Sequence, residues 1–295
     1  MDATKNIVSK ICVDAKKTCL ELADASTDQK NKFLYDFADL IKKNKNNLFT
    51  ANKKDILQAK KNGHNDAFID RLEINEETLL LMADGLIQIA LLPDPVGEII
   101  NARKQPSGIT VGTMRVPIGV VGIIYESRPN VTADAAGLCL KSGNTLILRG
   151  GSESLNSNLA IADLCSMALQ KNSIPEKAIQ IISAIDRDAV NELITQKDNV
   201  DIIIPRGGKS LIKKISENAT VPVIKHLDGI CHIYVDSDAD IEKALKITDN
   251  SKTQRLGTCN TLETLLVCQS IAPLFLPKIC SLLFKKKIEM RVCAI

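Results

Sequence analysis

Residues 116–151 read VPIGVVGIIYESRPNVTADAAGLCLKSGNTLILRGG. Two short apolar runs in this stretch, 116–125 and 145–148, are each followed by a polar turn and then a helix-forming segment. Buried parallel strands have this continuous apolar character, because helices cover both faces of their sheet. The stretch therefore predicts two parallel strands joined by a crossover helix at 131–141.

The same alternation continues toward the C-terminus. We predict strands at 178–182, 200–204, 233–235 and 263–267, and helices at 154–170, 187–195, 209–217, 241–250 and 271–283. Repeated strand–helix units are typical of the α/β class, with a doubly wound parallel sheet. Pro222 interrupts the rhythm near 221–227, so we expect one domain at 1–225 and a second at 226–295. A last strand is expected at 289–292, and the early end of the chain after it predicts an incomplete second domain.

The N-terminal part has a different pattern. Between residues 2 and 92, apolar side chains recur three and four positions apart, which predicts helices that end at Pro93 and Pro95. Residues 96–114 contain two apolar runs around the turn 105–108, which predicts a β-hairpin. The unpaired edges of such a hairpin favour a contact between subunits.

Composition excludes several classes of protein. The 295 residues include 38 Lys and Arg against 35 Asp and Glu, a net charge of +3, and only 3% aromatic residues. This argues against a nucleic-acid-binding protein with a broad basic face or stacking platforms. No apolar run is long enough to span a bilayer, and the N-terminus lacks the apolar core of a signal peptide.

Cysteine and histidine usage indicates the compartment and argues against a metal site. Nine cysteines, an odd number without a C-x-x-C pair, indicate a reducing compartment, and we expect the cytoplasm. Three histidines without an H-x-x-x-H pair make a zinc site unexpected, so we predict no metal.

Two corners of the predicted sheet share one design. Arg149-Gly150-Gly151 and Arg206-Gly207-Gly208 each end a strand and open a helix. Glycine lets the backbone approach a ligand closely, and the next helix presents free N–H groups. An arginine adds a charge-assisted donor for phosphate. The residues fit a dinucleotide site, but two ordinary turns with surface arginines would look the same.

Cys259 is the candidate nucleophile. It lies in 254–261, QRLGTCNT, among small and polar residues with Arg255 close by. A thiol at a tight turn can have a lowered pKa and act as a nucleophile, although a small buried hydrophobe is the alternative. His226 and His232 could each act as a general base or be structural. The polar turn 125–130, YESRPN, suits a substrate or cofactor corner, or a capped helix start.

Taken together, these stretches resemble gamma-glutamyl phosphate reductase, a branch of the aldehyde dehydrogenase superfamily. The resemblance is carried by 115–132, 139–153, 204–208 and 259–267, and it extends along the whole chain. It implies an aldehyde-dehydrogenase-like fold, with a cofactor domain followed by an incomplete catalytic domain. The implied reaction is NADPH-dependent reduction of L-glutamate 5-phosphate to L-glutamate 5-semialdehyde, with release of phosphate, in proline biosynthesis.

The resemblance also implies roles for three catalytic positions. Cys259 matches the catalytic thiol of the family, which forms a thioester. Ser127 stands where related aldehyde dehydrogenases have an amide that stabilises the oxyanion, so the donor would differ here. His226 stands where they have a catalytic glutamate, and a reductase that acts on an acyl phosphate has no water to activate.

Binding roles follow from the same resemblance. Ser152 and Glu153, after the corner at 149–151, match the region that holds the adenosine ribose of NADPH, and 207–209 match the turn that faces the pyrophosphate. The implied cofactor residues are Arg149, Gly150, Gly151, Ser152, Glu153, Arg206, Gly207, Gly208 and Lys209. The anionic substrate is expected to contact Arg128, Arg255 and Asn260.

The end of the chain departs from the family. Family members continue further and contain an Asn-x-x-Gly-Ser-x-His-Thr-like run that has no counterpart here. An inactive, truncated nucleotide-binding remnant is therefore one alternative. Another acylating aldehyde dehydrogenase, such as one that passes the acyl group to coenzyme A, is a second, although the run 259–264 argues against it. The implied partners are the acyl phosphate substrate, glutamate 5-kinase and, for a full-length chain, further copies of the protein.

Overall fold

The structure, a computed structural model, describes residues 2–225, 229–256 and 258–293. The chain divides into two units, Met1–Lys225 and His226–Ile295. Among the described residues, no helix combines the length and the apolar character that crossing a membrane requires.

A four-stranded parallel sheet forms the centre of the first unit. Its strands are β3 (Val120–Tyr125), β4 (Thr145–Gly150), β5 (Ile179–Ile181) and β6 (Ile202–Arg206), in the order β5-β4-β3-β6. All six residues of β3 are buried, which explains the uninterrupted apolar run in the sequence. The predicted α/β class with a parallel sheet is confirmed.

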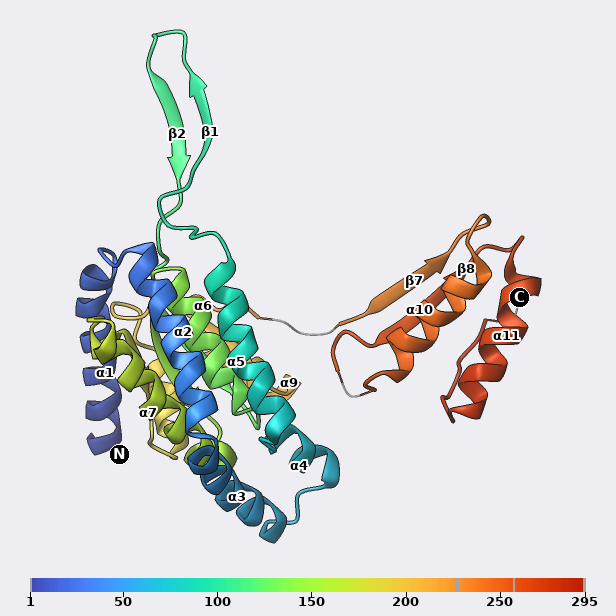
Figure 1. The fold of residues 1–295 in the computed structure, drawn as a ribbon, viewed down its shortest axis with the longest axis horizontal. Helices are drawn as coiled ribbons and strands as arrows, with labels where there is room; N and C mark the ends of the chain where they lie inside the picture. The colour runs from blue at the N-terminus through green and yellow to red at the C-terminus, as the bar shows by residue number, and fades with distance from the viewer. Residues whose placement is uncertain (1, 226–228, 257, 294–295) are drawn as a thin grey trace. The chain divides into compact units, whose positions relative to one another are not determined.

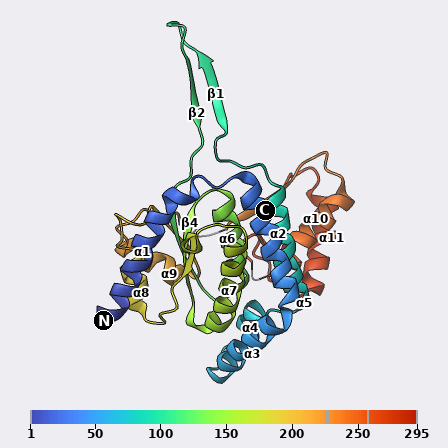
Figure 2. The same ribbon diagram turned by 60° about the vertical axis from the view of Figure 1, so that its left-hand side comes forward.

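Helices cover both faces of this sheet (Figure 2). On one face, Val121 and Ile123 of β3 share a core with α2 (Thr27–Lys43), α5 (Glu76–Leu91), α6 (Asn130–Lys141) and α7 (Leu155–Lys171). On the other, Val120 and Ile124 share a core with α1 (Asp2–Leu22), α8 (Arg187–Leu193) and α9 (Lys209–Asn218). Alternate residues of a strand point to opposite faces, so one strand contributes to both cores. This unit also contains α3 (Lys45–Lys61), α4 (Asp66–Leu72) and the short 3₁₀ helices η1 (Ser152–Ser154) and η2 (Glu176–Ala178).

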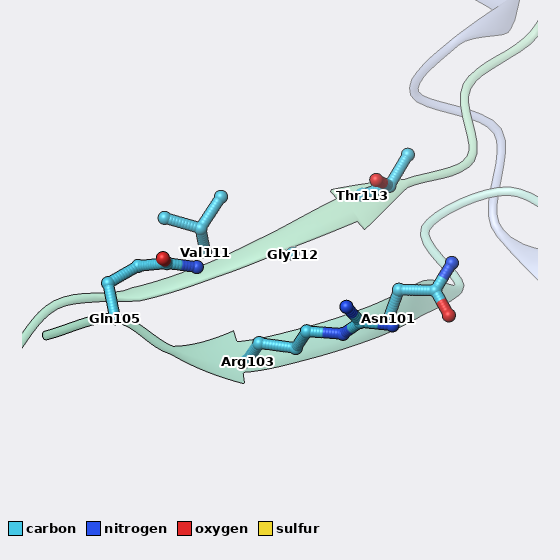
Figure 3. A pocket seen from close by; sticks show the side chains of 6 residues that line it. All are labelled: Asn101, Arg103, Gln105, Val111, Gly112 and Thr113. Carbon is cyan, nitrogen blue, oxygen red and sulfur yellow. The ribbon is translucent and has the colours of Figure 1, made fainter.

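The predicted hairpin is confirmed. Strands β1 (Ile99–Lys104) and β2 (Thr110–Met114) pair antiparallel and stand away from the rest of the first unit (Figure 1). Nearly all of their residues are exposed, apolar ones included. A shallow hollow on the hairpin is lined by polar side chains and Val111 (Figure 3). The hairpin leads into the amino end of β3, whereas the Arg-Gly-Gly corners lie at the carboxyl ends of strands, so this hollow belongs to a different region.

The second unit has its own small core. Strands β7 (Cys231–Val235) and β8 (Leu262–Val267) pair in parallel, and α10 (Ile241–Thr253) and α11 (Ala272–Lys285) accompany them. Val235, Phe275 and Ile279 are buried at the centre of this core. The strand predicted at 289–292 is wrong: these residues form no regular structure, and Arg291 pairs with Glu289 on the surface. An apolar pattern becomes a strand only where another strand pairs with it, and in the described part of the chain none does.

Candidate active site

The two Arg-Gly-Gly corners lie on either side of one strand. In the register of the sheet, Tyr125 at the end of β3 is the partner of both Gly150 in β4 and Arg206 in β6. The N–H of Glu126 continues this pairing by donating to the Arg206 carbonyl oxygen at 3.1 Å. The turn at 126–130 therefore begins between the corners, at the edge where α/β sheets bind ligands.

Glu126 occupies the start of α9. Its Oε2 accepts a hydrogen bond from the N–H of Gly208 at 2.9 Å, and Gly208 is the N-cap residue of α9. A Cβ at Gly207 would lie 2.6 Å from the same oxygen, so only glycine allows this approach without a shift. A carboxylate thus sits at the positive end of a helix, the place that phosphate groups prefer. In the sequence, Glu126 was not singled out within the polar turn 125–130, although its place directly after an apolar strand was a usable signal.

Ser127 and Glu153 connect the ends of β3 and β4. The N–H and the hydroxyl of Ser127 both donate to Oε1 of Glu153, each at 2.9 Å. Ser127 has a φ of 43°, a left-handed conformation that is uncommon for residues other than glycine. A Cβ at Gly151 would overlap the Glu153 carboxylate. Both Ser127 donors therefore face a carboxylate, and its predicted role near an oxyanion stays a prediction.

Arg149 is buried and faces main-chain oxygens. Its guanidinium donates to the carbonyl of Gly150 at 2.6 Å and to that of Ile185 at 2.9 Å. Within the described part of the structure, its Nε is buried without a hydrogen-bond partner. Burial lowers the pKa of Arg149, against the opposing effect of the carboxylates of Glu153 and Asp186. In this arrangement the side chain holds the loop that follows β5, and its contact with a cofactor phosphate stays a prediction.

Five of the predicted cofactor residues are exposed, whereas Gly150 is half-buried and Gly151 is buried. The side chain of Ser152 is exposed, as are the residues of the second corner, Arg206, Gly207, Gly208 and Lys209. Arg128, in the turn after β3, is half-buried. The first unit therefore presents a rim of backbone N–H groups and basic side chains at one edge of the sheet, which suits a phosphate-bearing ligand.

In the second unit, Cys259 lies on a turn that threonine hydroxyls hold in shape. The turn joins α10 to β8, and Thr258 and Thr261 donate to the Arg255 carbonyl oxygen at 2.9 and 2.7 Å. Lys252 Nζ donates to the Leu262 carbonyl oxygen at 2.8 Å, which fixes the start of β8. On this turn the Cys259 thiol is free and exposed.

The setting of Cys259 differs from that of the core cysteines. Burial raises the pKa of both Cys12 and Cys139 to about 12, so these thiols stay protonated at neutral pH. Arg255 and Asn260, the predicted substrate contacts nearest to Cys259, are both exposed. The thiolate is the form that attacks carbonyl carbon, and among these three cysteines only Cys259 is accessible to a substrate.

Of the two candidate histidines, the structure describes His232. His226 lies outside the described residues. His232 is exposed, with Nδ1 2.7 Å from the Ile230 carbonyl oxygen, a local backbone contact that suits a structural role. Across 2–225, 229–256 and 258–293, no three His, Cys, Asp or Glu side chains gather where they could hold a metal ion.

The sequence and the fold both match known proteins. The model of the aldehyde dehydrogenase family matches residues 1–290. The chain belongs to the aldehyde dehydrogenase family. The predicted resemblance to the gamma-glutamyl phosphate reductase branch of this family is confirmed by two solved structures.

These two structures cover almost the whole of the present aldehyde dehydrogenase chain. Gamma-glutamyl phosphate reductase from Thermotoga maritima is 41% identical, with a TM-score of 0.89 over 97% of this chain and 69% of its own. The enzyme of that name from Saccharomyces cerevisiae is 33% identical, with a TM-score of 0.69 over 92% of this chain and 69% of its own. A glyceraldehyde-3-phosphate dehydrogenase from Methanocaldococcus jannaschii, solved with NADP, is 18% identical, with a TM-score of 0.61 over 94% and 58% of the two chains. This third likeness shows the aldehyde dehydrogenase fold alone.

Proposed function

We propose that the protein reduces L-glutamate 5-phosphate to L-glutamate 5-semialdehyde with NADPH and releases phosphate, a step of proline biosynthesis. The observation that carries the proposal is the 41% identity and TM-score of 0.89 to a gamma-glutamyl phosphate reductase. The free, exposed thiol of Cys259 on a hydrogen-bonded turn supports it, because this chemistry needs a nucleophile that a substrate can reach.

The proposed reaction has two stages at Cys259. The thiolate attacks the acyl carbon of the γ-acyl phosphate, the C–O bond to phosphate breaks, and a thioester forms on Cys259. NADPH, when bound, supplies the hydride that reduces this thioester to the aldehyde and returns the thiolate. The Cys259 N–H is a candidate donor to the oxyanion. The basic side chain of Arg255, in the same unit as Cys259, is suited to bind an anionic group of the substrate.

The rim of the first unit is suited to hold the cofactor. The N–H of Gly208 at the start of α9 and the exposed Lys209 would face the pyrophosphate, provided that the Glu126 carboxylate moves aside. Ser152 and Glu153 would lie near the ribose, and Arg149 would orient the adjoining loop. We therefore assign cofactor binding to residues 1–225 and thioester formation to 226–295.

The cellular setting forms part of the proposal. All nine cysteines are free, which supports action in a reducing compartment, the cytoplasm. An acyl phosphate hydrolyses readily in water, so glutamate 5-kinase, which would make this substrate, is the proposed partner. The apolar side chains exposed on the hairpin support association with further copies of the chain.

The proposal is tested by running the reaction in reverse. Oxidation of glutamate semialdehyde should form NADPH from NADP only when phosphate is present, followed by the absorbance of NADPH. Cys259→Ser should abolish this turnover, because it removes the nucleophile, and should leave NADPH binding unchanged in a fluorescence titration. Cys139→Ser, at a buried cysteine of the other unit, is the matched control and should remain active.

Other results would favour the alternatives. Dependence on coenzyme A in place of phosphate would identify a different acylating aldehyde dehydrogenase. Binding of NADPH without turnover, under conditions in which the control folds equally well, would favour a nucleotide-binding remnant.

A further inference from the structure

A second thiol lies beside the proposed nucleophile. Cys231, the first residue of β7, donates from its Sγ to the carbonyl oxygen of Cys259 at 3.6 Å. Just before it, Gly229 lies so close that a Cβ there would overlap the same oxygen. The segment 229–231 therefore packs directly against the main chain of Cys259, within the second unit.

This contact places the two cysteines close to the separation that a disulfide needs. A carbonyl oxygen lies about 2.4 Å from its own Cα. Adding this to the hydrogen-bond distance shows that Cys231 Sγ lies within about 6 Å of Cys259 Cα. Because a cysteine Sγ lies about 2.8 Å from its own Cα, the Cα atoms of Cys231 and Cys259 lie within about 9 Å of each other. Disulfides join residues whose Cα atoms are about 4.4–6.8 Å apart, so rotation of the side chains and a shift of the turn by a few ångström would join the sulfurs. Both thiols are free, Cys259 is exposed and Cys231 is half-buried.

We propose that Cys231 is a resolving thiol that forms a disulfide with Cys259 when a hydroperoxide oxidises the nucleophile. The inference rests on the reactivity proposed for Cys259. In the first step, the Cys259 thiolate attacks the peroxide, the O–O bond breaks, and after protonation Cys259 sulfenic acid and an alcohol or water result. In the second, Cys231 attacks the sulfenic sulfur, the S–O bond breaks, and a disulfide and water form.

The disulfide would protect the enzyme from permanent loss. A sulfenic acid without a neighbouring thiol is open to further oxidation to sulfinic acid, which ordinary thiols do not reverse. The Cys231–Cys259 disulfide would block the nucleophile, and a dithiol would restore both thiols by exchange. Oxidation would then switch the reductase off reversibly.

Cys268 provides an internal comparison. It follows β8, whereas Cys259 precedes that strand, and the six residues of β8 span about 20 Å. A hydrogen bond from the Ser270 hydroxyl lowers the pKa of Cys268, so this thiol is also open to oxidation. If reactivity alone decided which disulfide forms, Cys268 would compete with Cys259, whereas proximity favours Cys259 as the partner of Cys231.

The test is a peptide map of the full chain after treatment with hydrogen peroxide. The protein is then alkylated and digested with trypsin without reduction. Cys231 falls in peptide 226–243, and both Cys259 and Cys268 fall in peptide 256–278. Three proteins are compared, the wild type, Cys231→Ser and Cys268→Ser, after checking that their melting temperatures agree.

We expect the linked pair of peptides in the wild type and in Cys268→Ser, and its absence in Cys231→Ser. Dithiothreitol should restore turnover to the oxidised wild type, whereas Cys231→Ser should accumulate Cys259 sulfinic acid and stay inactive. Loss of the linked pair in Cys268→Ser, or oxidised Cys259 beside an alkylated Cys231 in the wild type, would overturn the inference. The peptide map needs no turnover, so an inactive but cross-linked protein would count against the proposed function and not against the disulfide.

Discussion

Replacing Glu126 by glutamine should strengthen NADPH binding and weaken the fold. In the structure, the Glu126 carboxylate accepts the N–H of Gly208 at the N-terminus of α9, where we propose that the pyrophosphate binds. Glutamine keeps an acceptor oxygen of similar reach but removes the negative charge. The cofactor would then displace a neutral group, and its phosphates would no longer approach a carboxylate.

The magnitude follows from the exposure of the site. A negative charge at an exposed helix N-terminus contributes about 0.3–1 kcal/mol, and the exposed position of Glu126 places it within this range. The free energy of unfolding should therefore fall by about 0.3–1 kcal/mol in Glu126→Gln. The NADPH dissociation constant should fall by a factor of about 2–5, since each 1.4 kcal/mol is tenfold. The variant should thus be less stable and yet bind NADPH more tightly, a combination that general damage to the fold would not produce.

The assay is a fluorescence titration with NADPH at low and high salt, together with urea unfolding. Glu217→Gln is the matched control, because Glu217 is an exposed glutamate near the other end of the same helix, paired with Lys213. Its NADPH affinity should be unchanged. Weaker NADPH binding in Glu126→Gln would refute the reasoning, since it would mean that the carboxylate itself contacts the cofactor.

Two further predictions concern stability. Gly119→Ala should lower the free energy of unfolding by at least about 1–3 kcal/mol, because φ is 126° there and the new Cβ would overlap the Asp201 carboxylate. Urea unfolding measures this loss. Gly63→Ala is the milder control, because Gly63 also has a positive φ but a Cβ there would meet open space. The second prediction concerns Asp94. Burial raises the pKa of this carboxyl group, but the ion pair with Lys30 at 2.6 Å and two further hydrogen bonds outweigh that effect and hold the pKa below its ordinary value. The ionised Asp94 therefore contributes its full stabilisation of the folded state above about pH 4, and this contribution is lost as the pH falls through the lowered pKa. Asp94→Asn should be about 3–5 kcal/mol less stable than the wild type at neutral pH, because the buried Lys30 would lose its counter-charge. This difference in the free energy of unfolding should narrow in acid, and a difference that stays constant with pH in urea unfolding would contradict the prediction.

Local sequence pattern was sufficient for most of the secondary structure. The apolar run at 116–125 and the turn at 105–108 predicted a buried strand and a hairpin, and the structure contains a buried strand at Val120–Tyr125 and the hairpin. Such patterns are reliable because burial on one or both faces of an element imposes a period on its own residues. The strand expected at 289–292 was wrong because strand formation also needs a partner, which a local pattern does not contain.

The arrangement of the candidate site depended on contacts between distant residues. The sequence itself identified the two Arg-Gly-Gly corners, the Cys259 turn and the family to which they belong. Only the strand order β5-β4-β3-β6 placed both corners beside β3 and set the Glu126 carboxylate on the N-terminus of α9. Likewise, the parallel pairing of β7 with β8 brought Cys231 against Cys259, 28 residues away along the chain. Sequence periodicity reports which residues are buried, whereas the choice of neighbouring strand is settled by packing of the whole sheet, and this choice decides which side chains meet.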